Sequence, residues 1–132
     1  MRVVLDTNVL VSAFATRGLS ADVFRLVLAE HELIVGQIVL EELRRVLERK
    51  IGLPGSAVEE AVALLEDHRV VPTVDEDPGV EIADRSDARV LATALEAGAE
   101  VLVTGDRDLL SVKDRVQDLR ILDPRGFWEE LR

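Results

Sequence analysis

The hydrophobic and polar positions follow two patterns that alternate along the chain. Short, unbroken apolar runs occupy residues 3–5, 33–35 and 101–103. Runs of this length that are rich in β-branched residues are typical of strands buried on both faces, as in parallel sheets. Between these runs lie longer segments whose apolar residues recur at helical spacing, as in residues 38–50. The pattern therefore predicts strands and helices in alternation.

Two weaker runs, at residues 70–71 and 121–122, predict two further strands. Pro72 follows the first of them and cannot donate a ladder hydrogen bond, so we expect that strand at an edge of the sheet. Alternation of strand and helix favours parallel pairing, right-handed crossovers and helices on both faces of the sheet. The expected architecture is an α/β fold with about five parallel strands, in a single domain over residues 1–132.

Polar residues and glycines predict where several helices begin and end. Ser20 is expected to cap one helix, and Ser56 with Glu59 has the spacing of a capping box. A later helix is expected to start at Ser86 or Asp87 and to end at Gly98. Asp123 followed by Pro124 is typical of the start of a terminal helix. His31 and His68 have no second His or Cys at ligand spacing, so both are expected on the surface.

Two aspartates stand directly after predicted central strands. Asp6 follows the run at residues 3–5, and Asp106 follows residues 101–103 through Thr104 and Gly105. If these strands are neighbours, both carboxylates lie at the carboxyl edge of the sheet, where open α/β sheets bind ligands. The alternative for each residue is a cap on the following helix, which Asp does well. The pair together favours an acidic site.

Two more acids lie on predicted helices. Glu42 is at the edge of the apolar stripe that contains Val39 and Val46, and burial there costs free energy unless the carboxylate has a partner. An ion pair with Arg45 or Arg49 would explain it without a site. Asp87 lies in the first turn of its helix, where an acid also favours the helix dipole.

Composition narrows the chemistry. The chain has 132 residues, 48% of them hydrophobic, and contains no cysteine, which excludes disulfides and thiolate metal sites. The net charge of −10 argues against a broad basic surface for nucleic acid. Divalent cations bound among clustered acids would reverse that local charge. No signal peptide or membrane-length apolar run is present, so we expect a soluble, cytoplasmic protein with no membrane association.

Carboxylates without His or Cys are hard oxygen ligands, which suit Mg²⁺ or Mn²⁺ better than zinc. Such ions promote phosphodiester hydrolysis by activating water and stabilising the leaving oxygen. The sequence contains neither a P-loop glycine pattern nor a GxSxG motif, so nucleotide hydrolysis and serine hydrolase activity are unsupported.

Four motifs in this order resemble the PIN-domain nucleases, most closely the VapC-like toxins of bacterial or archaeal toxin–antitoxin pairs. They are LDTNVL at residues 5–10, Glu42-Leu43, Asp87 leading into LATA at residues 91–94, and TGDRDLL at residues 104–110. The resemblance covers essentially the whole chain. It implies a three-layer α/β/α sandwich and Mg²⁺- or Mn²⁺-dependent cleavage of RNA. It further implies a small antitoxin as a possible partner and a homodimer.

By this resemblance Asp6, Glu42, Asp87 and Asp106 are the catalytic, metal-binding acids. Thr7, Asn8, Thr104 and Asp108 match supporting positions. The turn before Asp87 reads Asp84-Arg85-Ser86, where relatives often have a proline and further acids. This departure leaves the role of Asp84 open.

Two other functions remain open at this point. A phosphatase of the haloacid dehalogenase type also begins with a strand followed by Asp, but it needs a second Asp two residues later, where this chain has Asn8. A receiver-like or degenerate metal-binding module that acts only through a partner is the non-enzymatic alternative.

Four arginines near the predicted acids are candidates for holding RNA. Arg45 and Arg49 lie on the helix of Glu42, and Arg85 and Arg89 bracket Asp87. These side chains would contact phosphates while the rest of the surface stays acidic. An ion pair with a neighbouring acid is the alternative for each of them.

Overall fold

The parallel sheet is present in the computed structural model, which describes residues 1–132 throughout. Its strands are β1 (Arg2–Leu5), β2 (Glu32–Gly36), β3 (Arg69–Val71), β4 (Val101–Val103) and β5 (Arg120–Leu122). All pairings are parallel and the order is β3-β2-β1-β4-β5, with Val4 opposite both Ile34 and Leu102. The order reverses at β1, so the carboxyl ends of β1 and β4 form the switch point where this fold class binds ligands. The expected neighbouring positions of these two strands are confirmed.

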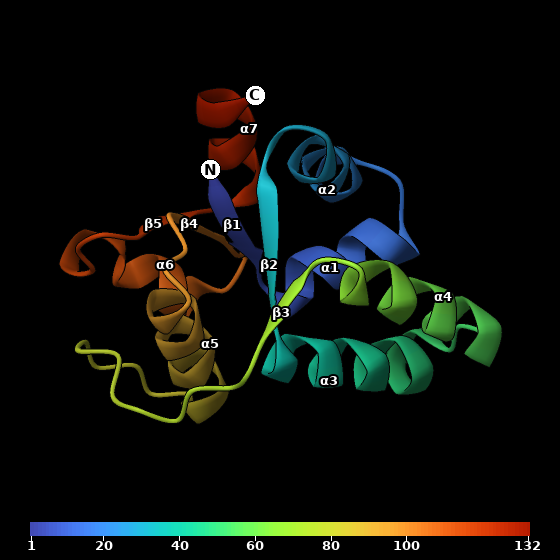
Figure 1. The fold of residues 1–132 in the computed structure, drawn as a ribbon, viewed down its shortest axis with the longest axis horizontal. Helices are drawn as coiled ribbons and strands as arrows, with labels where there is room; N and C mark the ends of the chain where they lie inside the picture. Colours follow the sequence, from blue (N-terminus) through green and yellow to red (C-terminus); the bar gives the residue numbers. More distant parts are fainter.

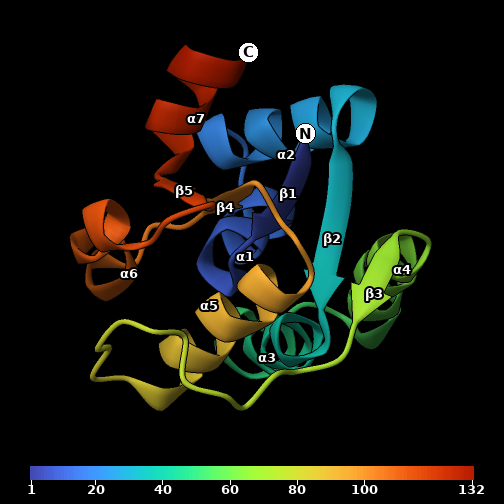
Figure 2. The same ribbon diagram turned by 60° about the vertical axis from the view of Figure 1, so that its left-hand side comes forward.

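Seven α-helices surround the sheet: α1 (Thr7–Ala15), α2 (Leu19–Glu30), α3 (Gln37–Val46), α4 (Gly55–Glu66), α5 (Arg85–Glu96), α6 (Arg107–Ser111) and α7 (Pro124–Leu131). Helices α1, α2 and α7 pack together on one face, and α5 packs with α6 on the other (Figure 2). Helices α3 and α4 lie side by side next to β2 and β3 (Figure 1). The three-layer α/β/α sandwich is therefore confirmed. Both termini lie at the end of the sheet opposite to α3 (Figure 1).

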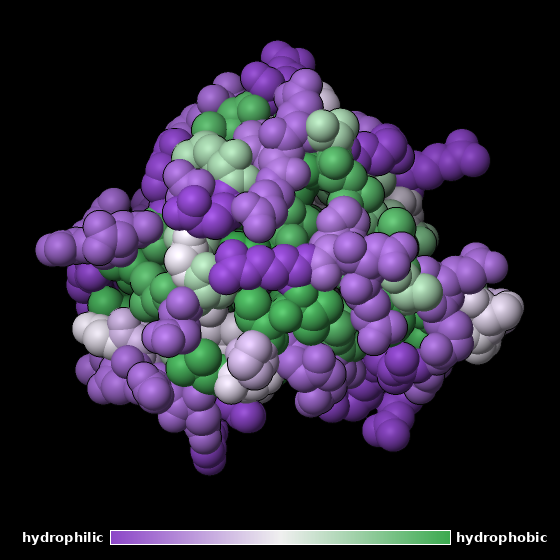
Figure 3. All heavy atoms as spheres, in the orientation of Figure 1, coloured by the Kyte–Doolittle hydropathy of each residue, from purple (hydrophilic) through white to green (hydrophobic).

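The core confirms the prediction that the central strands are buried on both faces. It contains 32 buried residues, and Val3, Ile34 and Leu102 have no exposed surface at all. Hydrophilic side chains cover much of the visible surface, although apolar atoms reach it near the middle of the face in Figure 3. None of the helices combines the length and the apolar character needed to cross a lipid bilayer.

Several predicted helix ends are confirmed. Gly98 has φ of 73° and follows Ala97, the C-cap of α5, which explains the glycine, since side chains disfavour this left-handed conformation. Asp123 caps α7 by accepting a hydrogen bond from the Gly126 N–H at 2.7 Å, and Pro124 is the first helical residue. Strand β3 is at the edge of the sheet, as Pro72 predicted.

Other predicted helix starts are wrong by one or two residues. Helix α2 begins at Leu19, before Ser20, and Gly18 precedes it without a side-chain cap. Helix α4 begins at Gly55, which places Ser56 inside the helix, so the capping box does not form. Helix α5 begins at Arg85, because the Asp84 carboxylate caps it by accepting from the Asp87 N–H at 3.0 Å. The role of Asp84, open from the sequence, therefore includes capping.

Helix α3 continues into a π-helical turn, η1 (Leu47–Ile51), and a 3₁₀ turn, η2 (Lys113–Arg115), follows α6. The prediction of a surface position holds only in part for both histidines, because His68 and His31 are half-buried. The His31 ring meets the Phe127 ring edge-on at 5.6 Å, and the His31 Nδ1 lies 3.2 Å from the terminal amine.

Candidate functional site

Asp6 is a buried carboxylate at the carboxyl end of β1, with 5% of its surface exposed. Its Oδ1 accepts a hydrogen bond from the Thr7 N–H at 2.8 Å, which caps α1. Its Oδ2 accepts from the Thr104 hydroxyl at 2.7 Å and from the Asn8 amide at 3.0 Å. The two interpretations of Asp6, helix cap and site residue, are thus compatible. One lone pair of Oδ1 remains free for a ligand.

Hydrogen bonds of Thr104 and Asn8 connect the residues that follow β1 with those that follow β4. The Thr104 hydroxyl donates to Asp6 and also accepts the Asp106 N–H at 3.0 Å. The Asn8 carbonyl oxygen accepts the Gly105 N–H at 2.8 Å. A side chain at Gly105 would meet this oxygen at 3.2 Å, so the close approach favours glycine. Both polar residues therefore fix the distance between the two aspartates.

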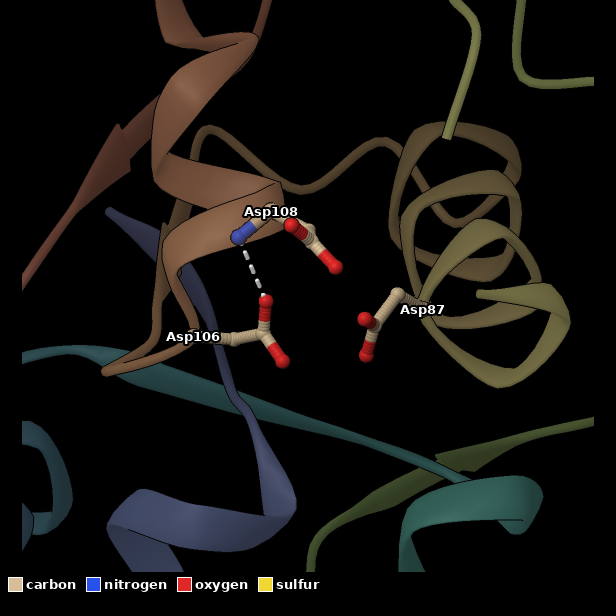
Figure 4. Close-up of side chains that lie close together, drawn as sticks. All are labelled: Asp87, Asp106 and Asp108. Atoms are coloured by element: carbon tan, nitrogen blue, oxygen red, sulfur yellow. Dashed lines mark hydrogen bonds between the residues drawn. The ribbon is translucent and has the colours of Figure 1, made fainter. Parts of the chain in front are cut away.

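Asp106, Asp87 and Asp108 form a compact group of acids from two helices. Asp106 caps α6 by accepting the Asp108 N–H at 2.7 Å, and Asp108 lies in the first turn of α6. Asp87 reaches the group from the first turn of α5, with its carboxylate directed toward Asp106 (Figure 4). One carboxylate oxygen of each residue lies within 4.8 Å of the others, close enough to share a metal ion.

Glu42 and Asp6 line the same pocket as Asp87 and Asp106. This pocket has a volume of about 490 Å³ and an apolar wall formed by Val11, Ala15, Val46 and Ile51. Among the residues that line this pocket, two buried polar atoms have no hydrogen-bond partner, Oε1 of Glu42 and the hydroxyl of Thr7. Buried polar atoms are normally paired, so each unpaired one requires an explanation. An all-oxygen donor set with an unpaired carboxylate oxygen suits a hard divalent cation.

Burial and mutual repulsion raise the pKa of three of these acids. Desolvation raises the pKa of Asp87 to about 7, with the charges of Asp106, Asp84 and Asp6 adding to the increase. Desolvation also raises the pKa of Asp6, against hydrogen bonds from Thr104, Thr7 and Asn8 that lower it. Like charges at close range disfavour ionisation, so the site without a counterion is electrostatically strained.

Desolvation likewise raises the pKa of Glu42, and the charge of Asp6 adds to the increase. The charge of Arg45 and the nearby Thr7 side chain lower this pKa, although the Arg45 guanidinium forms no ion pair with the carboxylate. The surface ion pair that could have explained Glu42 is therefore absent. A bound cation would supply the missing partner.

The four candidate arginines differ in their surroundings. Arg45 and Arg49 are exposed and form no ion pair. Arg85 and Arg89 both contact Asp75, in the loop between β3 and α5. Of these four arginines, only Arg45 and Arg49 have a positive charge that is not paired with an acid.

Sequence reasoning placed Val46 in the core and treated Asp108 as a supporting residue. In the structure Val46 lines the pocket, and Asp108 lies in the compact acid group. Helical periodicity cannot distinguish an apolar residue on a pocket wall from one in the core. Asp75 had no local signal, because its contacts are made across ten and fourteen residues.

Comparison with known proteins gives one family match. The model of the PIN domain family matches residues 2–108. A search of curated protein sequences found no significant match.

Three solved structures share the fold. FitAcB from Neisseria gonorrhoeae is 21% identical with a TM-score of 0.63, over 93% of this chain and 98% of that chain. VapBC2 from Rickettsia felis, bound to a promoter DNA fragment, is 17% identical with a TM-score of 0.63, over 93% and 98%. VapC20 from Mycobacterium tuberculosis, a sarcin–ricin loop cleaving toxin, is 18% identical with a TM-score of 0.62, over 83% and 94%.

Proposed function

This chain belongs to the PIN-domain family, and from that premise we propose that it is a divalent-cation-dependent endoribonuclease, a single domain over residues 1–132. The observation that carries the proposal is the convergence of poorly compensated acids at the switch point of the sheet. Asp87 and Asp106 lie at the centre of this group, with Asp108 on one side and with Asp6 and Glu42 lining the same pocket.

Mg²⁺ or Mn²⁺ would be held by Asp6, Glu42, Asp87 and Asp106, with Asp108 close enough to contribute. When bound, the ion would supply Lewis-acid activation of water and charge stabilisation at the leaving oxygen. The chain itself supplies the geometry. Thr104 and Asn8 hold the Asp6 carboxylate in one orientation, and Thr104 also fixes the backbone of Asp106.

RNA is the proposed substrate, held through its phosphates by Arg45 and Arg49. Both side chains are exposed, free of ion pairs, and carried by the helix and turn that include Glu42 and Ile51. Positive charge confined to this position would allow an acidic protein to bind RNA without a basic surface elsewhere.

A role as the toxin of a toxin–antitoxin pair extends this proposal. Its support is the shared fold with VapC20, a sarcin–ricin loop cleaving toxin, and with VapBC2. A small antitoxin and a second copy of the chain are the corresponding partners, and the cytoplasm is the corresponding location.

The phosphatase alternative is disfavoured by the surroundings of Asp6 and Asn8. Both Asp6 oxygens accept hydrogen bonds in a buried setting, which reduces their nucleophilicity. The Asn8 side chain is occupied by Asp6 and the Gly105 N–H, and an amide cannot serve as the general acid. The non-catalytic module differs from the nuclease in activity alone.

RNA cleavage tests the proposal. Wild-type protein should cleave single-stranded RNA with Mn²⁺ or Mg²⁺ and stop when a chelator is added. Asp106→Asn retains an Asx cap for α6 but removes a ligand charge, so it should fold and lose cleavage. Cleavage that survives in both the chelator and the variant would assign the activity to a contaminant and refute the proposal. Absence of cleavage in every condition would favour the non-catalytic module.

A further inference from the structure

Arg85 and Arg89 converge on a single carboxylate. Arg85 Nη2 donates to Asp75 Oδ2 at 3.1 Å, and Arg89 Nε lies 3.5 Å from Asp75 Oδ1. The arginines are four residues apart in α5, so they lie on the same side of the helix. Each oxygen of one anion thus faces its own guanidinium, an arrangement that also fits two oxygens of a phosphate.

Asp75, which pairs with both arginines, lies in the loop between β3 and α5 and not in a helix or strand. The Val74 N–H donates to the Thr93 hydroxyl at 2.9 Å, which fixes the chain one residue before Asp75. Residues 72–84 beyond β3 contain no helix or strand. Asp75 can therefore leave the arginines without unfolding an element.

Solvent exposure makes this internal pairing weak. Arg85 is 80% exposed and Asp75 is 55% exposed, and exposed ion pairs contribute little to stability. Arg89 is more enclosed, and its Nε is a buried atom without a hydrogen bond. A backbone phosphodiester carries one negative charge, as a carboxylate does, and its two non-bridging oxygens can accept from both guanidiniums, so it can replace Asp75 at small cost.

Arg85 and Arg89 lie next to the acid site but on the side of α5 that faces away from it. Asp87 is two residues from each arginine, which places it on the opposite side of α5. A helix is about 10 Å across, so a phosphate held here belongs to a nucleotide beyond the one at the acids.

We propose that Arg85 and Arg89 form a binding site for an RNA backbone phosphate beside the cleavage site, and that Asp75 occupies it as an exchangeable internal anion in the free protein. The identity of the ligand rests on the proposed ribonuclease function. The pairing of the arginines with an anion does not.

Asp75→Asn releases both arginines, and Glu76→Gln is the matched control. Glu76 is the next residue, is exposed, and forms no hydrogen bond or ion pair. Glu76→Gln therefore removes the same charge as Asp75→Asn without changing a contact of the arginines. RNA binding is measured by fluorescence anisotropy in an Asp106→Asn background with Mg²⁺, where cleavage is blocked. Asp75→Asn should raise RNA affinity about three- to tenfold more than Glu76→Gln.

Replacing Arg85 and Arg89 together by Gln should abolish this gain, because Asp75 then has nothing to release. It should also flatten the salt dependence of binding by a slope of about 0.7, the value for one single-strand phosphate contact. Equal effects of Asp75→Asn and Glu76→Gln, or a gain that persists without the arginines, would overturn the proposal.

A second measurement separates this site from the ribonuclease function. Pyrophosphate is titrated while the Arg89 Nε–H resonance is followed by NMR in otherwise wild-type protein. The resonance should shift at lower pyrophosphate concentration in Asp75→Asn than in Glu76→Gln. A resonance that does not respond in either variant would exclude an anion site here, whatever the RNA result. A response to pyrophosphate combined with no RNA binding would instead remove RNA as its ligand.

Discussion

Asp87→Asn should stabilise the metal-free protein, and more so at high pH. The folded-state pKa of Asp87 is raised from 3.8 to about 7, so between these values the folded protein retains a proton that the unfolded chain has lost. Stability must then fall as the pH rises through this window, by at most about 1.4 kcal/mol per pH unit. Asp84, not Asp87, caps α5, so the substitution removes repulsion without removing a cap.

The limit from pH 5 to pH 7 is about 3 kcal/mol, but Asp87 is only half-buried and water screens its charge. We therefore expect the stability of the variant relative to wild type to rise by about 1 kcal/mol from pH 5 to pH 8. Urea unfolding in chelator measures this difference. Asp114→Asn, an exposed acid without an ion pair, controls for the overall negative charge.

With bound metal, the order of stability of wild type and Asp87→Asn should be reversed. Mn²⁺ at the same concentration should stabilise wild type more than Asp87→Asn, since stabilisation by a ligand increases with the logarithm of its affinity for the folded state. A variant that is less stable than wild type at pH 8 in chelator would refute the inference that Asp87 is held against repulsion. An equal advantage at both pH values would also contradict it.

Two further predictions concern positioning and RNA binding. Thr104→Val removes the buried hydroxyl that donates to Asp6 and accepts from Asp106, and should lower the free energy of unfolding by about 2–4 kcal/mol. Thr104→Ser retains the hydroxyl and should cost about 1 kcal/mol or less, so equal urea midpoints for the two variants would contradict this. Replacing Arg45 and Arg49 by Gln should weaken RNA binding and flatten its salt slope by about 1.4. Arg69→Gln with Arg132→Gln, at positions that do not line the pocket of the acids, should leave the slope nearly unchanged. Equal slopes for the two pairs would exclude Arg45 and Arg49 as phosphate contacts.

The strands were predictable because a strand that is buried on both faces consists of consecutive apolar residues. The apolar runs ending at Leu5 and Val103 are continuous, and each is followed by polar residues at the carboxyl edge. Helix starts were less predictable, since Ser20 and Ser56 have cap chemistry but lie one residue inside their helices. Which of several adjacent polar residues becomes the cap depends on the loop that precedes it.

The site was predictable in its residues but not in its geometry. Asp6 and Asp106 could be placed together because parallel strands carry their following residues to one edge. The double use of Asp6 and Asp106 as caps and pocket residues was not foreseen, because the two interpretations had been treated as alternatives. The pairing of Asp75 with Arg85 and Arg89 depends on the path of an irregular loop, for which the sequence has no periodic signal.

The position of Mn²⁺ in crystals soaked with this ion, located by anomalous scattering, tests the central claim most directly. The account predicts a peak in the pocket at coordination distance, about 2.0–2.3 Å, from carboxylate oxygens of Asp87 and Asp106. At least one of Asp6, Glu42 and Asp108 should complete the ligand set. A pocket that stays empty at saturating Mn²⁺ and pH 8, while ions occupy other acids of the surface, would contradict it.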